Sequence, residues 1–409
     1  METHLADWIK GTADGDDAES ILRACVHCGF CNATCPTYQL RGDELDGPRG
    51  RIYQIKQVLE GVQPTQSTQL HLDRCLTCLN CETTCPSGVR YGRLVDIGRM
   101  AVEKRVPRKP LDAFRRATLR FALTRHWIFD TAVLLGRAMR SLLPASLRKK
   151  LSPLRKPGAT PKRIHTRKVI LLNGCVQPAL MPAIDAATSR VLDALGVQAV
   201  VAADSGCCGA IDYHLDAHDA ARAKARRNID AWWPLIDGGA EAMVINASGC
   251  GAMLKDYARV LRDDPAYRVK AERIAAMTRD LSEFLTPLVG ELVGKSGALT
   301  KQRIAFHPPC TLQHAQKIRG VVEAILTSLG AELVPIADSH LCCGSAGTYS
   351  ILQPALSQDL RARKLQNLER DRPDEILSAN IGCLSHLETG TATPVRHWIE
   401  WVDQRLQGI

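Results

Sequence analysis

The sequence predicts a mainly helical N-terminal domain followed by a duplicated α/β domain, in which parallel sheets carry flanking helices. Three observations predict this fold class: sixteen cysteines fall into four groups of four, the chain repeats itself after residue 167, and strand signals occur only in the repeated part. One core cannot hold 409 residues, because single cores stop growing near roughly 250 to 300 residues. We therefore expect four segments, with the boundaries 1–104, 105–166, 167–298 and 299–409.

The bulk composition is that of an ordinary globular protein, since 45% of the residues are hydrophobic and 23% are charged. No apolar run approaches the roughly 18 to 20 residues that a membrane-spanning helix needs. The first residues, METHLADWIKGTADGDDAE, carry acids where a secretory signal would carry basic residues before an apolar stretch. We expect a cytoplasmic protein, in which thiols stay reduced, so the sixteen cysteines indicate metal ligation rather than disulfides.

The N-terminal domain shows helix patterns and no strand pattern. Apolar residues at helical spacing predict helices at about Pro48 to Glu60 and Leu94 to Lys104. Between Pro110 and Leu143 the same spacing among arginines predicts one or two basic amphipathic helices. Four prolines then mark an exposed linker, namely Pro144, Pro153, Pro157 and Pro161.

The formal net charge of +10 is concentrated in one region, because residues 101–170 contain 19 Lys and Arg against three acids. Such a basic excess favours docking on an acidic partner or on anionic lipid headgroups, with Arg115, Arg116 and Arg120 among the cations. A solvated linker that charge keeps soluble is the alternative interpretation. The docking interpretation predicts that this cytoplasmic protein contacts the inner face of the cytoplasmic membrane peripherally, through residues 105–166.

The chain after the linker contains two copies of one pattern. Each copy opens with a strand that leads to a cysteine, followed by a helix that ends in glycine, a second strand, Cys-Cys-Gly, a long helix and a third strand. This order predicts parallel pairing through right-handed crossovers. The matching segments are KVILLNG and RIAFHPP, ATSRVLDALG and VVEAILTSLG, QAVVAAD and ELVPIAD, Leu215 to Trp233 and Gln353 to Glu369, and AMVINA and EILSAN.

Two segments near the N-terminus carry the same four-cysteine motif. CVHCGFCNATCP and CLTCLNCETTCP both fit C-x2-C-x2-C-x3-C-P, the pattern that holds 4Fe-4S cubanes in bacterial two-cluster ferredoxins, where the fourth cysteine ligates the other cluster. Zinc ribbons, the alternative, use separated C-x2-C pairs and have no need of a regular third and fourth cysteine before proline. We therefore expect one cluster on Cys25, Cys28, Cys31 and Cys85, and a second on Cys75, Cys78, Cys81 and Cys35.

These motifs predict a carrier of electrons. Clusters held by four thiolates exchange single electrons and leave no open coordination site, so we assign no catalytic residue to this chain. No G-x-G-x-x-G turn follows a strand, and no P-loop occurs. Flavin or nicotinamide chemistry must therefore come from another chain.

The repeated part carries the other eight cysteines. We expect each half to gather four thiols at the carboxyl ends of neighbouring strands, where they hold an iron-sulfur cluster or zinc: Cys175, Cys207, Cys208 and Cys250 in the first half, and Cys310, Cys342, Cys343 and Cys383 in the second. The Cys-Cys-Gly segments resemble the cysteine-rich (CCG) domain family, which includes domains of heterodisulfide reductase, lactate-utilisation proteins and anaerobic glycerol-3-phosphate dehydrogenase. The family motif ends in C-x2-C, and the first of those positions is Ala247 or Asn380 here.

Longer segments extend the resemblance over nearly the whole chain, among them SILRACVHCGFCNATCPTYQL, DELDGPRGRI, LDRCLTCLNCETTCPSGVRYG, DSGCCGAIDYHL and DSHLCCGSAGTY. These segments resemble the iron-sulfur subunits of bacterial glycolate oxidase, also called glycolate dehydrogenase. The resemblance implies two FAD-type partner subunits that oxidise glycolate to glyoxylate, with this subunit relaying electrons to a membrane acceptor such as quinone. No nucleic-acid partner is expected.

Three alternatives stay open. The first is thiol or disulfide reduction at a CCG-domain cluster, as in heterodisulfide reductase, although the departures at Ala247 and Asn380 argue against it. The second is the iron-sulfur subunit of a related lactate or glycerol-3-phosphate dehydrogenase, because the substrate never touches this chain. The third is an interaction scaffold whose CCG halves bind zinc or nothing.

Overall fold

The computed structural model describes residues 1–142, 155–297 and 301–408. The chain divides into two compact units: one contains Met1–Ala117 and His340–Lys364, and the other contains Thr118–Ser339 and Leu365–Ile409. Within the described residues, every strand belongs to the second unit. The four segment boundaries expected from the sequence remain predictions.

The first unit is built from helices that begin where the sequence supplies start signals. The Thr12 side chain caps the first helix by accepting a hydrogen bond from the Gly15 amide, and prolines occupy the first positions of α3 and α4. Helix α8 (Pro110–Leu123) starts in this unit, as does α22 (Pro354–Glu369). The remaining helices are α1 (Ala13–Ala24), α2 (Phe30–Ala33), α3 (Pro36–Arg41), α4 (Pro48–Leu59), α5 (Gln66–Asp73), α6 (Asn80–Thr84), α7 (Tyr91–Glu103) and α21 (Tyr349–Leu352), with a short 3₁₀ turn at Glu44–Asp46.

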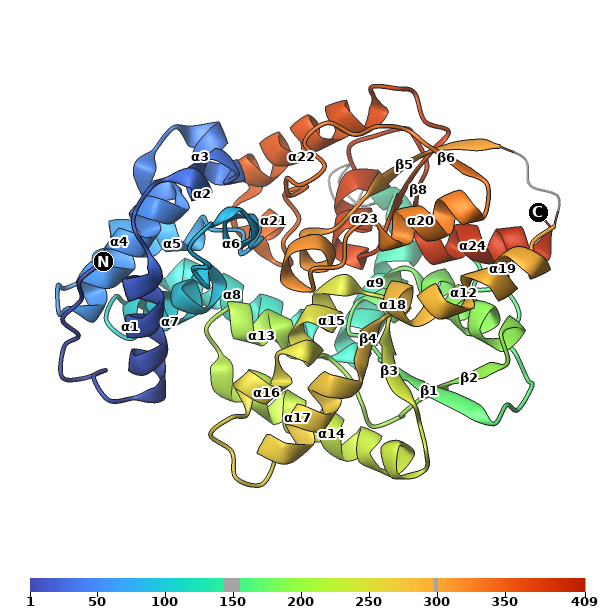
Figure 1. The fold of residues 1–409 in the computed structure, drawn as a ribbon, viewed down its shortest axis with the longest axis horizontal. Helices are drawn as coiled ribbons and strands as arrows, with labels where there is room; N and C mark the ends of the chain where they lie inside the picture. The colour runs from blue at the N-terminus through green and yellow to red at the C-terminus, as the bar shows by residue number, and fades with distance from the viewer. Residues whose placement is uncertain (143–154, 298–300, 409) are drawn as a thin grey trace. The chain divides into compact units, whose positions relative to one another are not determined.

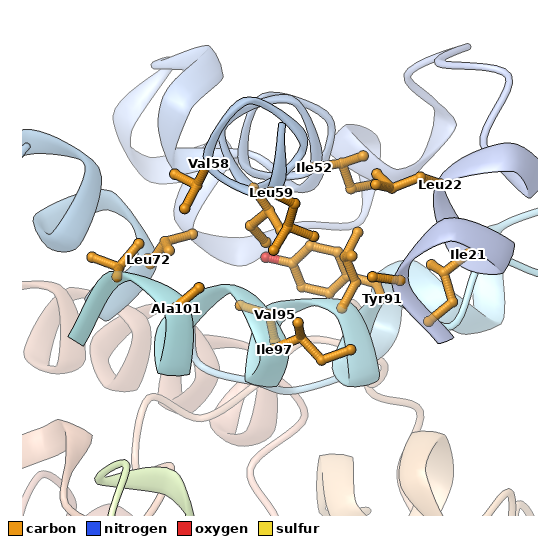
Figure 2. Close-up of a cluster of buried hydrophobic side chains, with 14 of the residues drawn as sticks. Ile21, Leu22, Ile52, Val58, Leu59, Leu72, Tyr91, Val95, Ile97 and Ala101 are labelled. Atoms are coloured by element: carbon orange, nitrogen blue, oxygen red, sulfur yellow. The ribbon is translucent and has the colours of Figure 1, made fainter. Parts of the chain in front are cut away.

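Helix α7 is the centre of the core of this unit, because α1, α4 and α5 all pack against it. Figure 2 shows the ring of Tyr91 lying between α4 and α7, in contact with the apolar side chains of both helices. The two helices approach closely at Gly98, where a Cβ atom would lie 2.5 Å from Cγ1 of Ile55. A side chain at residue 98 would therefore force α4 and α7 apart.

The second unit holds two parallel four-stranded sheets with the same order (Figure 1). The first sheet runs β2-β1-β3-β4 and the second β6-β5-β7-β8, so each central strand pairs with neighbours reached by crossovers. Their bounds are β1 (Arg167–Leu171), β2 (Val197–Val201), β3 (Ala242–Ile245), β4 (Thr278–Asp280), β5 (Gln302–His307), β6 (Ala331–Leu333), β7 (Glu375–Ser378) and β8 (Val395–His397).

Helices cover and connect these sheets. Helix α12 of the first half packs against α24 of the second half, which joins the two halves of the duplication in one unit. The helices are α9 (His126–Ala138), α11 (Gln177–Leu180), α12 (Pro182–Ala194), α13 (Ala210–His214), α14 (His218–Asp237), α15 (Ser248–Lys255), α16 (Tyr257–Val260), α17 (Arg268–Met277), α18 (Leu281–Leu285), α19 (Val289–Lys295), α20 (Val321–Ser328), α23 (Ile381–Glu388) and α24 (Trp398–Gln407), with a π-helical turn at Thr311–Ala315 and 3₁₀ turns at Arg140–Leu142 and Thr286–Leu288.

The predicted fold class is confirmed, with three local corrections. The helix expected from Leu94 begins earlier, at Tyr91. The long helix expected at Leu215 to Trp233 is α14, which begins later, at His218, and ends later, at Asp237, because Asp216 adopts a left-handed backbone (φ 62°) between it and the short helix α13. Each sheet also has a fourth strand, β4 or β8, that the sequence pattern did not predict, because three residues are too few for an alternating pattern.

The basic region forms two helices, α8 and α9, as predicted, and the linker prolines Pro144 and Pro153 lie outside the described residues. The expectation for Arg116 was wrong. Its side chain is buried and pairs with Asp73 and Asp112, so it stabilises the fold of the first unit instead of serving as a free docking cation. Across the described ranges, no helix is both long and apolar enough to cross a bilayer.

Candidate metal centres

The two cysteine motifs of the first unit follow the same backbone course. Each starts directly after a helix, α1 or α5, and turns into a short helix, α2 or α6. Equivalent positions adopt left-handed backbone, namely His27 (φ 58°) and Gly29 (φ 89°) in the first motif and Thr77 (φ 51°) and Leu79 (φ 61°) in the second. Such backbone is uncommon at residues other than glycine, so its repetition shows that both motifs build the same tight loop.

One set of four cysteines lines a small cavity and is termed the outer site. Three come from the first motif and one from the second, and Cys28 is exposed to solvent. Burial raises the pKa of Cys25, and burial together with the neighbouring Cys25 charge raises the pKa of Cys31 to about 11. The outer site consists of Cys25, Cys28, Cys31 and Cys85.

A second set lines a neighbouring small cavity and is termed the inner site. It consists of Cys35, Cys75, Cys78 and Cys81. Cys81 and Tyr91 line both cavities, so the two sites are immediate neighbours. The structure therefore brings together the two crossed sets that the spacing predicts, and their ligation of clusters remains a prediction.

Two buried arginines flank the inner site. Arg51 of α4 is 1% exposed, and Arg99 of α7 is 9% exposed. The Arg99 guanidinium donates to the carbonyl oxygen of Cys75 at 2.7 Å and to Oγ1 of Thr77 at 2.9 Å. Burial opposes the charge of Arg51, but Cys75 and the other negative groups around it hold its pKa above the ordinary value.

The same charges act on the inner thiols in different ways. Complete burial would raise the pKa of Cys75, but Arg51 and Arg99 lie close enough to hold that pKa below the ordinary value. The Tyr91 hydroxyl donates to Sγ of Cys75 at 3.6 Å, which favours the thiolate further. Burial and the neighbouring thiolates instead raise the pKa of Cys81 well above its usual range. The positive field is thus strongest at Cys75.

The sequence did not lead us to expect Arg51, Tyr91 and Arg99 as residues of the inner site. A signal was available, because Arg51 occupies the apolar face of α4 at helical spacing from Ile55, and Arg99 occupies the same kind of position on α7. A charged side chain on the buried face of a helix needs partners, and here they are carbonyl and hydroxyl oxygens.

A separate acidic group in this unit does not suit a metal ion. Side chains of Asp43, Asp46 and His71 lie within 4.8 Å of one another. Asp46 also pairs with Arg74 at 3.0 Å and lies 3.5 Å from a guanidinium nitrogen of Arg51. These fixed cations already neutralise the buried carboxylate, so the group is a structural ion-pair network.

In the first α/β half, four thiols lie close together at the carboxyl ends of three neighbouring strands. Cys175 follows β1, the Cys207–Cys208 pair follows β2, and Cys250 lies in α15 after β3. Hydrogen bonds join these thiols in a chain from Cys175 through Cys207 and Cys208 to Cys250. Hydrogen bonds from Cys175 and Cys208 lower the pKa of Cys207, and donating to Cys207 raises the pKa of Cys175. The structure therefore brings these four thiols together, and their ligation of a cluster remains a prediction.

In the second half the structure places the cysteines in both units. Cys310 and Cys383 belong to the second unit and follow β5 and β7, whereas Cys342 and Cys343 belong to the first. All four are buried. The Gly344 amide donates to Sγ of Cys342 at 3.4 Å. The convergence of these four sulfurs remains a prediction.

The two positions that depart from the CCG motif are not equivalent. Ala247 is buried and offers no ligand atom. Asn380 lies next to the second-half cysteine, with Nδ2 3.8 Å from Sγ of Cys383, and its Oδ1 accepts from the Gly249 amide at 3.4 Å. Asn380 therefore links the ligand segments of the two halves instead of adding a fifth thiol.

The cysteine sets fit an iron-sulfur cluster chemically. All sixteen cysteines are free thiols. Tetrads made only of sulfur suit iron-sulfur clusters or zinc. Burial, and after it the charges of neighbouring thiolates, raises the pKa of Cys31 and of Cys81, and bound iron would relieve the repulsion between the thiolates.

The N-terminal cysteine motifs and the α/β halves both match known protein families. Residues 21–89 match the 4Fe-4S dicluster domain, which contains the outer and inner sites. Residues 169–255 and 304–388 match the cysteine-rich domain, once in each α/β half. Iron-sulfur clusters are accordingly the cofactors of this chain.

Individual relatives extend over the whole chain. The glycolate oxidase iron-sulfur subunit of Escherichia coli (strain K12) is 52% identical over 408 residues, which cover 100% of both chains. The probable glycolate oxidase iron-sulfur subunit of Bacillus subtilis (strain 168) is 30% identical and covers 91% of this chain and 89% of its own. Lactate utilization protein A of Geobacillus thermodenitrificans is 29% identical over 58% of this chain and 99% of its own length. The chain belongs to the family of glycolate oxidase iron-sulfur subunits.

Proposed function

We propose that this chain is the electron-transfer subunit of a flavin-dependent glycolate dehydrogenase. The observation that carries the proposal is the pair of crossed four-cysteine sets, which lie side by side in one helical unit. Full-length similarity to glycolate oxidase iron-sulfur subunits supports the choice of enzyme. The chain itself turns over no substrate in this proposal, because none of its described segments supplies a flavin site.

The proposed ligands are Cys25, Cys28, Cys31 and Cys85 for one 4Fe-4S cluster, and Cys75, Cys78, Cys81 and Cys35 for the other. Each cluster takes up and releases one electron when bound. The protein supplies the rest of the chemistry: α4 and α7 fix the loops, and the buried arginines balance the negative charge of the thiolates.

We assign the first-half set, Cys175, Cys207, Cys208 and Cys250, to a further iron-sulfur cluster, and we extend the assignment to Cys310, Cys342, Cys343 and Cys383. Iron analysis of the anaerobically purified chain tests it. Two clusters alone would give about eight irons per chain, and occupied CCG halves would give about twelve to sixteen, because each cubane carries four irons. Zinc in place of the additional iron would leave these halves with a structural role.

The proposed partners are two FAD-type subunits that oxidise glycolate to glyoxylate. The chain should be purified with them, and its clusters monitored by EPR after addition of glycolate, lactate or glycerol 3-phosphate. Glycolate should reduce the clusters in the complex and leave the isolated chain oxidised. Reduction by lactate alone would assign the subunit to a lactate dehydrogenase, and disulfide reduction without partners would indicate the heterodisulfide-reductase type of chemistry.

We also propose that electrons pass to a quinone while α9 rests on the membrane surface. Helix α9 and the turn after it leave a stripe of large apolar side chains in solvent: Trp127 is 72% exposed, Leu134 69% and Leu142 77%. Basic residues surround this stripe in the sequence, as in helices that lie in the interface of anionic bilayers. The inward face is fixed by Arg137, which donates to the carbonyl oxygens of Ala179 and Leu180 at 2.9 Å.

Vesicle sedimentation tests this contact. The chain should bind vesicles that contain phosphatidylglycerol more strongly than neutral vesicles, and Leu134→Ser with Leu142→Ser should weaken binding at unchanged iron content. Val201→Ser is a matched control, because Val201 is 51% exposed on β2, outside α9. Equal binding of all variants would leave the alternative that the basic region is a solvated linker.

A further inference from the structure

We propose that the inner site holds the cluster with the higher reduction potential, so that electrons enter the first unit at the outer site and leave from the inner site towards Cys342 and Cys343. The inference rests on the proposed function for its donor and acceptor: reduced flavin supplies two electrons one at a time, and a quinone takes up two electrons and two protons. The order of the two potentials is a property of this chain alone.

The outer site is built for entry, because it reaches the surface. Cys28 is exposed, and two apolar neighbours in the same loop are largely in solvent, Val26 at 69% and Phe30 at 62%. An exposed apolar rim next to a ligand suits a transient protein contact, and it shortens the path to a donor cofactor. Three of the four inner-site cysteines, Cys35, Cys75 and Cys81, are buried.

Hydrogen bonds to ligand sulfurs separate the two sites. The Tyr91 hydroxyl donates to Sγ of Cys75 at 3.6 Å, and the Thr37 hydroxyl lies 3.2 Å from Sγ of Cys35. The Thr77 amide also donates to Sγ of Cys75 at 3.4 Å, but the His27 amide makes the equivalent bond to Cys25 at the outer site, so the hydroxyl groups make the difference. Hydrogen bonds to the sulfurs raise the potential of a cluster, because the reduced cluster carries more negative charge and gains more from them.

Buried positive charge acts in the same direction. Arg51 and Arg99 are shielded from water beside the inner site, where Arg51 lines the cavity and Arg99 donates to the Cys75 carbonyl oxygen. Arg51 shares the single carboxylate of Asp46 with Arg41 and Arg74, so this buried group keeps a net positive charge that solvent screens little. One terminal nitrogen of the Arg51 guanidinium makes no hydrogen bond in the described structure, and Asp46 lies 3.5 Å from it. The Arg51 side chain also lines the inner cavity. A reduced cluster in that cavity would stabilise this nitrogen by its added negative charge.

The outer site has weaker positive charges. The N-terminal ammonium donates to the Cys25 carbonyl oxygen at 2.8 Å and is partly in water. Arg49, next to Gly29, is neutralised by Glu44 at 2.6 Å. Solvent exposure favours the reduced state at the outer site, which opposes the proposed order. The two arginines of the inner site, however, are almost fully buried: Arg51 lines the inner cavity, and Arg99 donates to the Cys75 carbonyl oxygen at 2.7 Å. We therefore expect their field to decide the order.

Tyr349 marks the exit. Its hydroxyl donates to the carbonyl oxygen of Arg74 at 3.1 Å, one residue before the inner ligand Cys75. Tyr349 follows the Cys-Cys-Gly segment of the same compact unit, six residues after Cys343. The next cysteine pair along an electron path from the inner site is therefore Cys342 and Cys343.

Redox titration of the isolated, cluster-loaded chain followed by EPR tests the proposal without glycolate or partner subunits. Tyr91→Phe removes the hydroxyl donor and keeps the ring in the core. We expect it to lower the potential of the higher-potential cluster and to leave the other cluster unchanged. Tyr53→Phe is the matched control, because Tyr53 is 47% exposed on α4 and makes no contact with Cys75 among the described interactions. It should shift neither potential.

A shift of the lower-potential cluster in Tyr91→Phe would reverse the order and overturn the proposal, and so would the absence of any shift. Arg99→Met provides an independent variant, with a larger downward shift of the same cluster expected and restoration by Arg99→Lys. Failure of glycolate to reduce the complex would contradict the proposed function and would leave the order of the potentials standing. A reversed order with glycolate-dependent reduction intact would contradict only this inference.

Discussion

The two α/β halves share the same sheet topology and differ in the last residue of the fourth strand. Both sheets run in the order second, first, third and fourth strand, and both fourth strands end in the N-cap of a helix. In the first half Asp280 caps α18 by accepting from the Ser282 amide, and in the second half His397 caps α24 by accepting from the Ile399 amide. A glutamate, Glu283 or Glu400, completes a capping box in each half.

The duplicated halves therefore keep a hydrogen-bond acceptor at the capping position, but they do not keep the charge of the capping side chain. Both caps are buried, and burial favours the neutral form of each side chain. It raises the pKa of Asp280 to about 6 and lowers the pKa of His397 to about 3. The same structural role therefore gives the two halves opposite responses to pH.

The largest expected effect concerns His397. Because its folded pKa of about 3 lies below the ordinary 6.5, its neutral form contributes stability above pH 6.5 that is lost as the pH falls towards 3. The full loss is roughly 5 kcal/mol. Hydrogen exchange of peptides from β8 and α24 should show local opening that increases below pH 6.5. The reference at each pH is His397→Asn, because asparagine keeps a side-chain acceptor.

In His397→Asn the acid-dependent part of this opening should disappear, whatever the variant does to stability at pH 8. The same peptides in Asp280→Asn serve as the control, because the substitution lies in the other sheet and should leave their pH dependence unchanged. Equal acid sensitivity of the wild type and His397→Asn would show that His397 stays neutral in both the folded and the opened state.

The contribution of Asp280 to stability should depend on pH in the opposite direction, and the effect should be smaller. Its folded pKa of about 6 lies above the ordinary 3.8, so its stabilising form is present below pH 3.8 and is lost as the pH rises through 6. The difference is roughly 3 kcal/mol. Peptides from β4 and α18 should exchange faster relative to Asp280→Asn at pH 7.5 than at pH 4.5. No difference between the two pH values would contradict the assignment.

The sequence was sufficient for the elements that carry a strong pattern and insufficient for the fourth strands. Runs such as KVILLNG gave the central strands, because fully buried parallel strands are continuously apolar. The fourth strands contain only Thr278–Asp280 and Val395–His397, each with a polar or charged residue in a run of three. Their position depends on pairing with β3 and β7, which no local pattern encodes.

The site could be predicted to a similar extent. Motif spacing was enough to predict the crossed cysteine sets, since the loops are local and repeat their backbone angles. Arg51 and Arg99 were not predicted, because the role of a single charge on an apolar helix face depends on the carbonyl and hydroxyl oxygens that folding brings to it. The prediction for Arg116 was wrong for the same reason, since its partner Asp73 is distant in sequence.

A third prediction concerns the ion pair that joins the halves. Arg190 of α12 contacts both carboxylate oxygens of Asp403 of α24, with the shortest distance 2.7 Å, and the side chain of Asp403 is only 7% exposed. Arg190→Gln should destabilise the second unit by about 2 kcal/mol, because it leaves a buried carboxylate without its cation. A double-mutant cycle with Asp403→Asn should give a coupling energy of at least about 1 kcal/mol that changes little with salt. Additive effects would show that the halves associate without this pair.

The smallest expected effect lies where the ends of the central strands meet. The hydroxyl groups of Ser248 and Thr311 lie 2.7 Å apart, each from a different half, and Ser248 is fully buried. Ser248→Ala and Thr311→Val each remove one partner and leave the other unsatisfied, so each should cost about 1 kcal/mol. The double variant should cost less than the sum of the two, because it leaves no orphaned hydroxyl.

Urea unfolding at constant iron content measures this, with iron checked because Ser248 is close in sequence to Cys250. The joint itself should survive, since the Ser248 amide still donates to the Ala379 carbonyl oxygen at 3.1 Å in each variant. A loss of several kcal/mol in either single variant would mean that the hydroxyl pair, and not this backbone bond, holds the two halves in register.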